Sequence, residues 1–397
     1  MRSFEQELAQ LERAQLRRRR LTVEAFTAPA QRVGLRIEGR ELTDFSSNDY
    51  LGLAREPALA RAMAECAARA GAGSAASHLV SGHGREHAQL EEALAEFTGR
   101  ERALLFGSGY AANLAVMSSL AGRGERALLD KLSHASLIDG ARLSGAQLQR
   151  YRHADAAAAR QVLGAAGAPV AVLATDGVFS MDGDLAPLPA LAQAAAARGA
   201  RLIVDDAHGL GVIGPTGRGS LEHFGLDAHA VPVLVGTLGK AFGSYGAFVA
   251  GEAALVEFLL QKARSYIYTT ALPQPVAAAS RVALELVRRE GWRRERVRAL
   301  TARFRARALA AGVPLMDSAT PIQPVVLGSA AAVLAVQARL QAAGYLVVAI
   351  RPPTVPQGRA RLRIALSAAH EEAQVDALVD ALAAALAATA AHPQVLA

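Results

Sequence analysis

The segment RLIVDDAHG, residues 201–209, is an apolar run of strand length that ends in two carboxylates and a histidine. In an open α/β sheet, ligands bind beyond the carboxyl ends of the strands. Capping of a following helix would explain one aspartate, but not Asp205 and Asp206 together with His208. We therefore expect an α/β fold with a ligand site at the end of this strand.

Similar apolar runs lie on both sides of this segment and alternate with helical patterns. Because strands that alternate with helices favour parallel pairing, the pattern predicts a mostly parallel, doubly wound sheet. The expected strands cover residues 103–106, 126–129, 170–174, 201–205 and 232–236, with helices at 85–98 and from 107–112 onward.

At the two ends of the chain, the regular alternation of strands and helices is absent from the sequence pattern. An amphipathic helix is expected over residues 4–16, and residues 33–37 and 41–45 are expected to form a β-hairpin. Beyond residue 275 the expected elements are helices at 275–311, 330–343 and from 371, and strands at 322–326, 345–350 and 361–367. We therefore divide the chain into an N-terminal helix and hairpin segment (1–45), a large domain (46–280) and a small C-terminal α+β domain (281–397).

Composition excludes several classes of protein. Of the 397 residues, 52% are hydrophobic and 20% are charged, which excludes a disordered or fibrous chain. The net charge is +7, but outside Arg17–Arg20 the arginines are scattered, so no nucleic-acid partner is expected. We expect neither a membrane span nor a secretory signal. The single cysteine, Cys66, excludes a disulfide within the chain and a multi-thiolate metal site, so we expect a cytoplasmic protein without a metal ion.

The chain has three lysines, Lys131, Lys240 and Lys262, among its 43 cationic residues. Lys240 lies between glycines in VLVGTLGKAFG, residues 233–243, directly after an expected strand. This is not a Walker A loop, because Leu234 stands where the first glycine is required. A partly desolvated lysine at a strand end can form a Schiff base with an aldehyde, whereas we expect Lys131 and Lys262 to be solvated.

Two glycine-rich segments differ in what they can bind. GLGVIG, residues 209–214, precedes Pro215 and further glycines that cannot continue a helix, which excludes a Rossmann dinucleotide site. GSGYAAN, residues 107–113, joins a strand to a helix whose first N–H groups can bind a phosphate. Tyr110 or His134 offers a ring that can stack on a flat ligand. A phosphate cradle, a stacking ring, a strand-end aspartate and a Schiff-base lysine together are what pyridoxal 5′-phosphate requires.

On these and further motifs, the chain resembles the α-oxoamine synthase family of fold-type I pyridoxal-phosphate enzymes over nearly its whole length. The motifs are FSSNDYLGL (45–53), LSHASL (132–137), GVFSMDGD (177–184), VDDAHG (204–209), TLGK (237–240) and IRPPTVP (350–356). The resemblance implies a large domain with a mostly parallel mixed sheet, a smaller C-terminal α+β domain, and a homodimer with its sites at the subunit interface.

The resemblance also implies roles for individual residues. Lys240 binds the cofactor covalently and then acts as general base, Asp205 pairs with the pyridine nitrogen, and His208 pairs with the phenolic oxygen. His134 stacks on the cofactor ring and contacts substrate. The other implied cofactor contacts are Gly109, Tyr110, Ser180 and Thr237, with Thr269 and Thr270 reaching the phosphate of the neighbouring subunit. The implied substrate contacts are Arg363 for the amino-acid carboxylate, Arg351, Thr354 and one arginine of the run Arg17–Arg20, for which we take Arg20.

The implied reaction is the decarboxylative condensation of L-alanine with a pimeloyl group, carried as a thioester on acyl-carrier protein or CoA. IRPPTVP favours this branch over sister enzymes that use glycine or serine, namely 2-amino-3-ketobutyrate ligase, 5-aminolevulinate synthase and serine palmitoyltransferase. A non-catalytic protein of this fold would lack Lys240 or Asp205, and both are present. Asp176 stands where relatives often carry glutamate, which leaves open whether that carboxylate contacts substrate.

Overall fold

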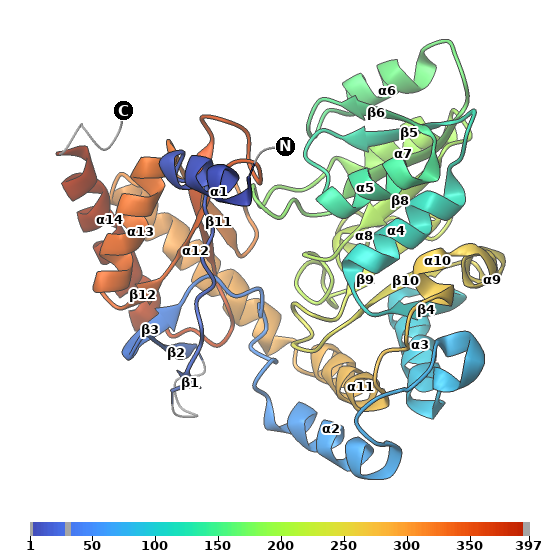
Figure 1. Ribbon diagram of the computed structural model, residues 1–397, viewed down its shortest axis with the longest axis horizontal. Coiled ribbons are helices and arrows are strands. Elements are labelled where there is room, and N and C mark those ends of the chain that lie inside the picture. Colours follow the sequence, from blue (N-terminus) through green and yellow to red (C-terminus); the bar gives the residue numbers. More distant parts are fainter. Residues whose placement is uncertain (1–2, 28–32, 392–397) are drawn as a thin grey trace. The chain divides into compact units, whose positions relative to one another are not determined.

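The structure is a computed structural model that describes residues 3–27 and 33–391, and the chain forms two compact units (Figure 1). The large unit consists of Leu51–Ser180 and Leu185–Arg294. The small unit consists of Met1–Tyr50, Met181–Asp184 and Glu295–Ala397. The expected fold class, a mostly parallel α/β sheet with a smaller α+β part, is confirmed.

The large unit is built on a seven-stranded sheet with the order β4-β10-β9-β8-β7-β5-β6. β10 is antiparallel to both of its neighbours, β4 and β9, and every other pair is parallel. All strands except β10 therefore end at the same edge of the sheet. The strands are β4 (Arg102–Phe106), β5 (Arg126–Asp130), β6 (Gln147–Tyr151), β7 (Val170–Asp176), β8 (Arg201–Asp205), β9 (Val233–Thr237) and β10 (Ala247–Gly251).

Helices cover both faces of this sheet, and alternate side chains of each strand point to opposite faces. In β8, Ile203 packs in the core cluster that contains α4 and α5, while Leu202 and Val204 pack in the cluster that contains α6 and α7. This burial on both faces explains why β8 is continuously apolar. The helical elements of the large unit are α2 (Pro57–Ala70), the π-helical turn η1 (His78–Gly82), α3 (Arg85–Thr98), α4 (Gly109–Leu120), α5 (Ala135–Ser144), α6 (Ala156–Gly164), α7 (Leu188–Ala196), α8 (Ser220–His223), α9 (Ala253–Lys262), α10 (Arg264–Ile267) and α11 (Gln274–Arg289).

The small unit has two sheets, with orders β1-β2-β3-β12 and β11-β14-β13. The predicted hairpin is present as β2 and β3, and the parallel strand β12 extends its sheet. The elements are α1 (Phe4–Arg13), β1 (Ala25–Phe26), β2 (Gly34–Ile37), β3 (Arg40–Asp44), β11 (Ile322–Gly328), α13 (Ala330–Ala342), β12 (Tyr345–Leu346), β13 (Val348–Ile350), β14 (Ala360–Ala365), α14 (Glu372–Ala390) and most of α12 (Trp292–Ala310).

The bounds of the two compact units differ from the domain boundaries predicted from the sequence. The boundary predicted between residues 280 and 281 lies inside α11, and the compact unit that holds the C-terminal elements also includes Met1–Tyr50. The division of the chain into three folding regions stays a prediction. Within the described residues, three strands were not predicted: the two-residue strand β1, the partly exposed edge strand β6 and the small-residue strand β10.

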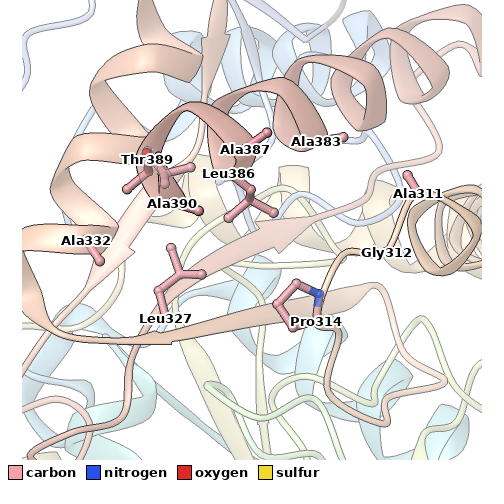
Figure 2. A pocket seen from close by; sticks show the side chains of 11 residues that line it. Ala311, Gly312, Pro314, Leu327, Ala332, Ala383, Leu386, Ala387, Thr389 and Ala390 are labelled. Carbon is pink, nitrogen blue, oxygen red and sulfur yellow. The ribbon is translucent and has the colours of Figure 1, made fainter. Parts of the chain in front are cut away.

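α14 is long and apolar enough to cross a membrane by length and composition alone. Its side chains Val375, Leu378 and Leu382 nevertheless lie in the core cluster of the small unit. Beside it is an apolar cavity of about 370 Å³, into which Leu327 and Leu386 point (Figure 2). The polar residue that lines the cavity, Thr389, donates its hydroxyl to the Ala385 carbonyl at 2.8 Å. We therefore assign no ligand to this cavity.

Candidate active site

The residues singled out in the large unit follow the carboxyl ends of four strands that end at one edge of the sheet. Gly109 follows β4, His134 follows β5, Asp205 ends β8, and Lys240 follows β9. This is the edge at which open α/β sheets bind ligands. The topology therefore brings together side chains that are up to 131 positions apart in the sequence, from Gly109 to Lys240.

Lys240 and His208 are in direct contact, with 3.0 Å between Nζ and Nε2. Lys240 is half-buried and sits in the tight loop between β9 and β10, where the Gly243 N–H donates to the Lys240 carbonyl at 2.8 Å. Gly243 has φ +62°, and a Cβ there would lie 2.3 Å from the Ala54 nitrogen. The loop that carries the lysine is therefore packed closely against neighbouring backbone.

Asp205 is buried and is held by a neighbouring amide. Asn113 of α4 donates its Nδ2 to Asp205 Oδ2 at 2.6 Å and to Ser136 Oγ at 2.9 Å. The Asp205 Oδ1 accepts the Ala207 N–H at 3.1 Å. Ser136 Oγ lies 2.7 Å from His134 Nδ1, so one chain of hydrogen bonds links the strand-end carboxylate to the predicted stacking ring.

His134 is the N-cap of α5, and its ring is open to solvent on one side. Surrounding protein nevertheless removes enough water to lower the pKa of His134, against the attraction of Asp205. The ring is therefore neutral at physiological pH, which suits stacking on a flat ligand.

Asp176 ends β7 and is buried beside Asp205, with which it is paired in register. Burial and then the negative charge of Asp205 raise the pKa of Asp176 well above its ordinary value. Its Oδ2 accepts the His134 N–H at 3.0 Å. Asp176 therefore orients the backbone at His134, which is a role that needs no contact with substrate.

Asp206, the second carboxylate of the strand-end motif, has a packing role. It is fully buried, and its Oδ2 accepts the Ser220 N–H at 2.7 Å. Gly219 has φ +89°, and a Cβ there would lie 1.9 Å from the same oxygen. Burial raises the pKa of Asp206 to about 7.

The start of α4 has the form of an anion site. Ser108 caps the helix by accepting the Ala111 N–H, and a Cβ built at Gly107 or Gly109 would meet nothing within 4 Å. The Ala111 N–H is taken up by this cap, so an anion at the helix start would be bound by the N–H groups of Gly109 and Tyr110. Tyr110 is exposed, and its hydroxyl donates to Asp139 of α5.

The other cofactor residues inferred from the sequence are on the same unit. Thr237 ends β9 and donates its hydroxyl to the Gly246 carbonyl at 3.1 Å. Ser180 is half-buried in the turn that follows β7. Thr269 and Thr270 are exposed after α10, and Thr270 forms an isolated β-bridge with Ser77.

In the small unit, Arg363 on β14 is buried and held by two oxygens. Its Nη2 donates to Asn48 Oδ1 at 2.9 Å and to the Tyr50 hydroxyl at 3.1 Å. Burial raises the pKa of Tyr50, so the hydroxyl stays protonated and adds no negative charge beside Arg363.

The arginine run and the IRPPTVP segment also meet within the small unit. Arg18 donates its Nη2 to Thr354 Oγ1 at 2.9 Å, while Arg20 stays a predicted substrate contact. Arg351 contacts the Gln15 carbonyl, and the bond between Pro352 and Pro353 is cis. The structure therefore selects Arg18 from the run as the neighbour of Thr354.

Sequence reasoning missed Asn113 and Ser136 as members of the site. Both stand inside segments that were noted, GSGYAAN and LSHASL, but an amide and a hydroxyl on helices carry no local sign of a distant carboxylate. A weak signal was available, because Asn113 is a polar residue on the inner side of an otherwise apolar helix.

Comparisons with known proteins agree with this geometry. The model of the aminotransferase class I and II family matches residues 40–382. The chain is 56% identical to the 8-amino-7-oxononanoate synthase of Thioalkalivibrio sulfidiphilus, over 94% of each chain. It is 60% identical to that of Methylococcus capsulatus, over 84% of this chain and 86% of the relative.

Solved structures of two kinds of enzyme share the fold of this chain. A serine palmitoyltransferase from S. paucimobilis with a bound PLP-myriocin aldimine has a TM-score of 0.91 at 29% identity, covering 98% of this chain and 97% of that chain. The 8-amino-7-oxononanoate synthase from Francisella tularensis has a TM-score of 0.76 at 32% identity, covering 86% of this chain and 97% of that chain. The chain belongs to the class I and II aminotransferase family and, within it, to the 8-amino-7-oxononanoate synthases.

Proposed function

We propose that the chain condenses L-alanine with a pimeloyl thioester and releases carbon dioxide and the free carrier, giving 8-amino-7-oxononanoate for biotin biosynthesis. The observation that carries this proposal is the contact of Lys240 with His208, at the edge of the sheet where Asp205 is held by Asn113. The function named for relatives at 55–60% identity supports it.

The donor set fits pyridoxal 5′-phosphate, which the enzymes of this family use. Lys240 would hold its aldehyde carbon, Asp205 its ring nitrogen and His208 its phenolic oxygen. The open first turn of α4 at Gly109 would hold its phosphate, with Thr237 nearby along the same edge. When bound, the cofactor supplies an electron sink for the carbon next to the substrate amino group.

The side chains of this protein then supply proton transfer and orientation. Lys240 Nζ takes the α-proton of alanine as general base, and His208 Nε2 at 3.0 Å keeps that nitrogen in place. The neutral ring of His134 covers one face of the reacting plane. Arg363 binds the alanine carboxylate with its guanidinium fork, because Asn48 and Tyr50 fix the orientation of that fork.

At the other end of the substrate, we propose that Arg18, Arg351 and Thr354 bind the distal carboxylate of the pimeloyl chain. Arg18 and Thr354 are hydrogen-bonded. Burial, and then the positive charge of nearby Arg18, lower the pKa of Arg351. Two arginine charges held near each other attract a carboxylate.

The proposal is tested by the visible absorption of the purified protein as amino acids are added. L-Alanine should change the spectrum of the yellow holoenzyme, and pimeloyl thioester should then be consumed with release of one carrier thiol. Lys240→Ala is the matched control and should lose product formation by at least about 10²–10⁴-fold. A protein that stays colourless with pyridoxal phosphate would contradict the assignment.

A second candidate is a sister condensing enzyme, favoured by the structural neighbours that are serine palmitoyltransferases with TM-scores of 0.90–0.91. Serine or glycine would then change the spectrum and alanine would not. That result would keep the chemistry of Lys240 and change the substrate.

We further propose an acidic acyl-carrier protein as the carrier, because Arg17, Arg19 and Arg20 are exposed beside Arg18. Replacing Arg17 and Arg19 with Gln, while keeping Arg18 and Arg20, should weaken use of the carrier-bound substrate and flatten its salt dependence without affecting the CoA thioester. Equal loss with both thioesters would contradict a protein carrier.

We also propose a cytoplasmic homodimer, in keeping with the buried free thiol of Cys66.

A further inference from the structure

Three histidines of the large unit gather on elements that carry none of the strand-end residues. His78 begins η1, His83 follows it, and His87 lies in the first turn of α3. One ligand nitrogen of each lies within 4.8 Å of the other two. His78 Nδ1 and His83 Nδ1 are 3.0 Å apart.

We propose that His78, His83 and His87 bind one Zn²⁺ ion through their Nδ1 atoms. This site goes beyond the function proposed above and does not depend on it. The single cysteine Cys66 excludes a multi-thiolate metal site but not a site made of histidines, so the expectation of no metal ion did not cover this cluster.

One of the three rings already has the kind of partner that metal-binding histidines use. The His87 Nε2 contacts the Leu272 carbonyl, and a carbonyl on one ring nitrogen orients the ring so that the other nitrogen can bind a metal. In His87 that other nitrogen, Nδ1, accepts the Gly84 N–H at 2.9 Å. In His83, Nε2 lies 3.9 Å from Glu91 Oε2, which is beyond hydrogen-bond distance, and Nδ1 lies 3.0 Å from His78 Nδ1.

The geometry requires only local adjustment. Zinc–imidazole bonds of about 2.0–2.1 Å place ligand nitrogens about 3.3–3.4 Å apart in a tetrahedron. The pair at 3.0 Å would open slightly, and His83, the exposed member, has room to move. The ion would replace the Gly84 N–H, which now donates to His87 Nδ1 at 2.9 Å. The proton shared by His78 and His83 would shift to an Nε2 atom by exchange with water.

Imidazole nitrogen is preferred by late first-row cations such as Zn²⁺, and three protein ligands leave a fourth position for water.

The site is tested with Co²⁺ as a visible probe for Zn²⁺ on the chelator-treated holoenzyme. One equivalent should bind with a tetrahedral d–d spectrum, seen as a difference from the cofactor absorption, and Zn²⁺ should displace it. His83→Asn should bind at least about 100-fold more weakly, and Glu91→Gln about 10–100-fold more weakly.

His229→Asn, which changes an exposed histidine elsewhere in the large unit, is the control and should bind like wild type. Unchanged cofactor absorption in His83→Asn would show that the variant is folded. Binding that does not saturate at one equivalent, or that His83→Asn leaves unchanged, would overturn the proposal. Loss of condensing activity has no bearing on this result.

Discussion

The amide of Asn113 connects two side chains at the carboxyl edge of the sheet. It donates to Asp205 at 2.6 Å and to Ser136 at 2.9 Å, while its own Oδ1 is buried without a partner. A hydrogen bond to a charged group is among the stronger ones, so this donor holds the buried carboxylate in place. Asn113 therefore acts as a positioning residue for Asp205.

Asn113→Ala should lower kcat about 10- to 100-fold, because a hydrogen bond to a charged group contributes about 1.5–3 kcal/mol. Asn113→Asp should be worse, since a second carboxylate would repel Asp205 instead of donating a hydrogen bond to it. The measurements are kcat with alanine and the dissociation constant of pyridoxal phosphate. If Asn113→Asp were as active as Asn113→Ala, the electrostatic part of this role would be wrong.

Asp206 predicts a pH dependence of stability. Its pKa is about 7 in the folded protein and about 3.9 in an unfolded chain. The folded state therefore binds the extra proton between these values, so the stability contribution of Asp206 is present below pH 4 and is lost as pH rises through 7. Relative to Asp206→Asn, the wild-type free energy of unfolding should fall by up to about 4 kcal/mol over this window.

Urea unfolding of both proteins at several pH values measures this difference. Asp227→Asn is the control, and its pH dependence should have the opposite sign. The Ala230 N–H donates to exposed Asp227 and lowers its pKa, so the contribution of Asp227 to the free energy of unfolding is lost as pH falls. A pH-independent difference between wild type and Asp206→Asn would contradict the prediction.

Among the elements, β14 has a structural role besides carrying Arg363. Arg361, two residues earlier on the same strand, is 2% exposed and pairs with Asp182 at 2.5 Å. Its Nη1 also donates to the Met181 carbonyl at 3.1 Å. The strand therefore fixes the short segment Met181–Asp184 within the small unit.

Arg361→Met should destabilise the protein by about 3–5 kcal/mol, because it leaves the Asp182 charge buried and uncompensated. The double variant Arg361→Met with Asp182→Leu should recover part of this loss in urea unfolding. Arg102→Met is the control, since its pair with Glu257 is exposed and should contribute about 0–1 kcal/mol. Equal losses from both arginines would show that burial does not matter here.

The sequence predicted elements well where a single signal was strong. β7, β8 and β9 are apolar because they are buried on both faces, and α3 starts and ends as expected. β10 was missed because alanine and glycine have low strand propensity and only its tertiary position makes it a strand. In the site, Lys240 and His208 followed from local motifs, whereas Asn113 depended on a contact across 92 positions of sequence.

At the scale of the whole molecule, the proposed homodimer with shared sites predicts complementation between inactive variants. Lys240→Ala and the pair Thr269→Val with Thr270→Val should each be inactive as pure dimers. In a mixed dimer, one site would carry both lesions and the other would carry none. Unfolding and refolding an equal mixture should therefore restore about a quarter of wild-type activity, as random pairing in a two-fold dimer requires.

No recovery, with mixed dimers shown by mass, would mean that Thr269 and Thr270 act within their own subunit. Sedimentation should give twice the 41.4 kDa mass of one chain. A monomeric active enzyme would contradict the dimer.

The chain path through the two units has a consequence for synthesis on the ribosome. The hairpin of β2 and β3 emerges first, yet β3 gains its parallel partner only when Tyr345 pairs with Thr43. At about 5–20 residues per second, the intervening chain takes roughly 15–60 s to appear. The large unit can complete its sheet during that delay, while the first strands made are among the last to be covered.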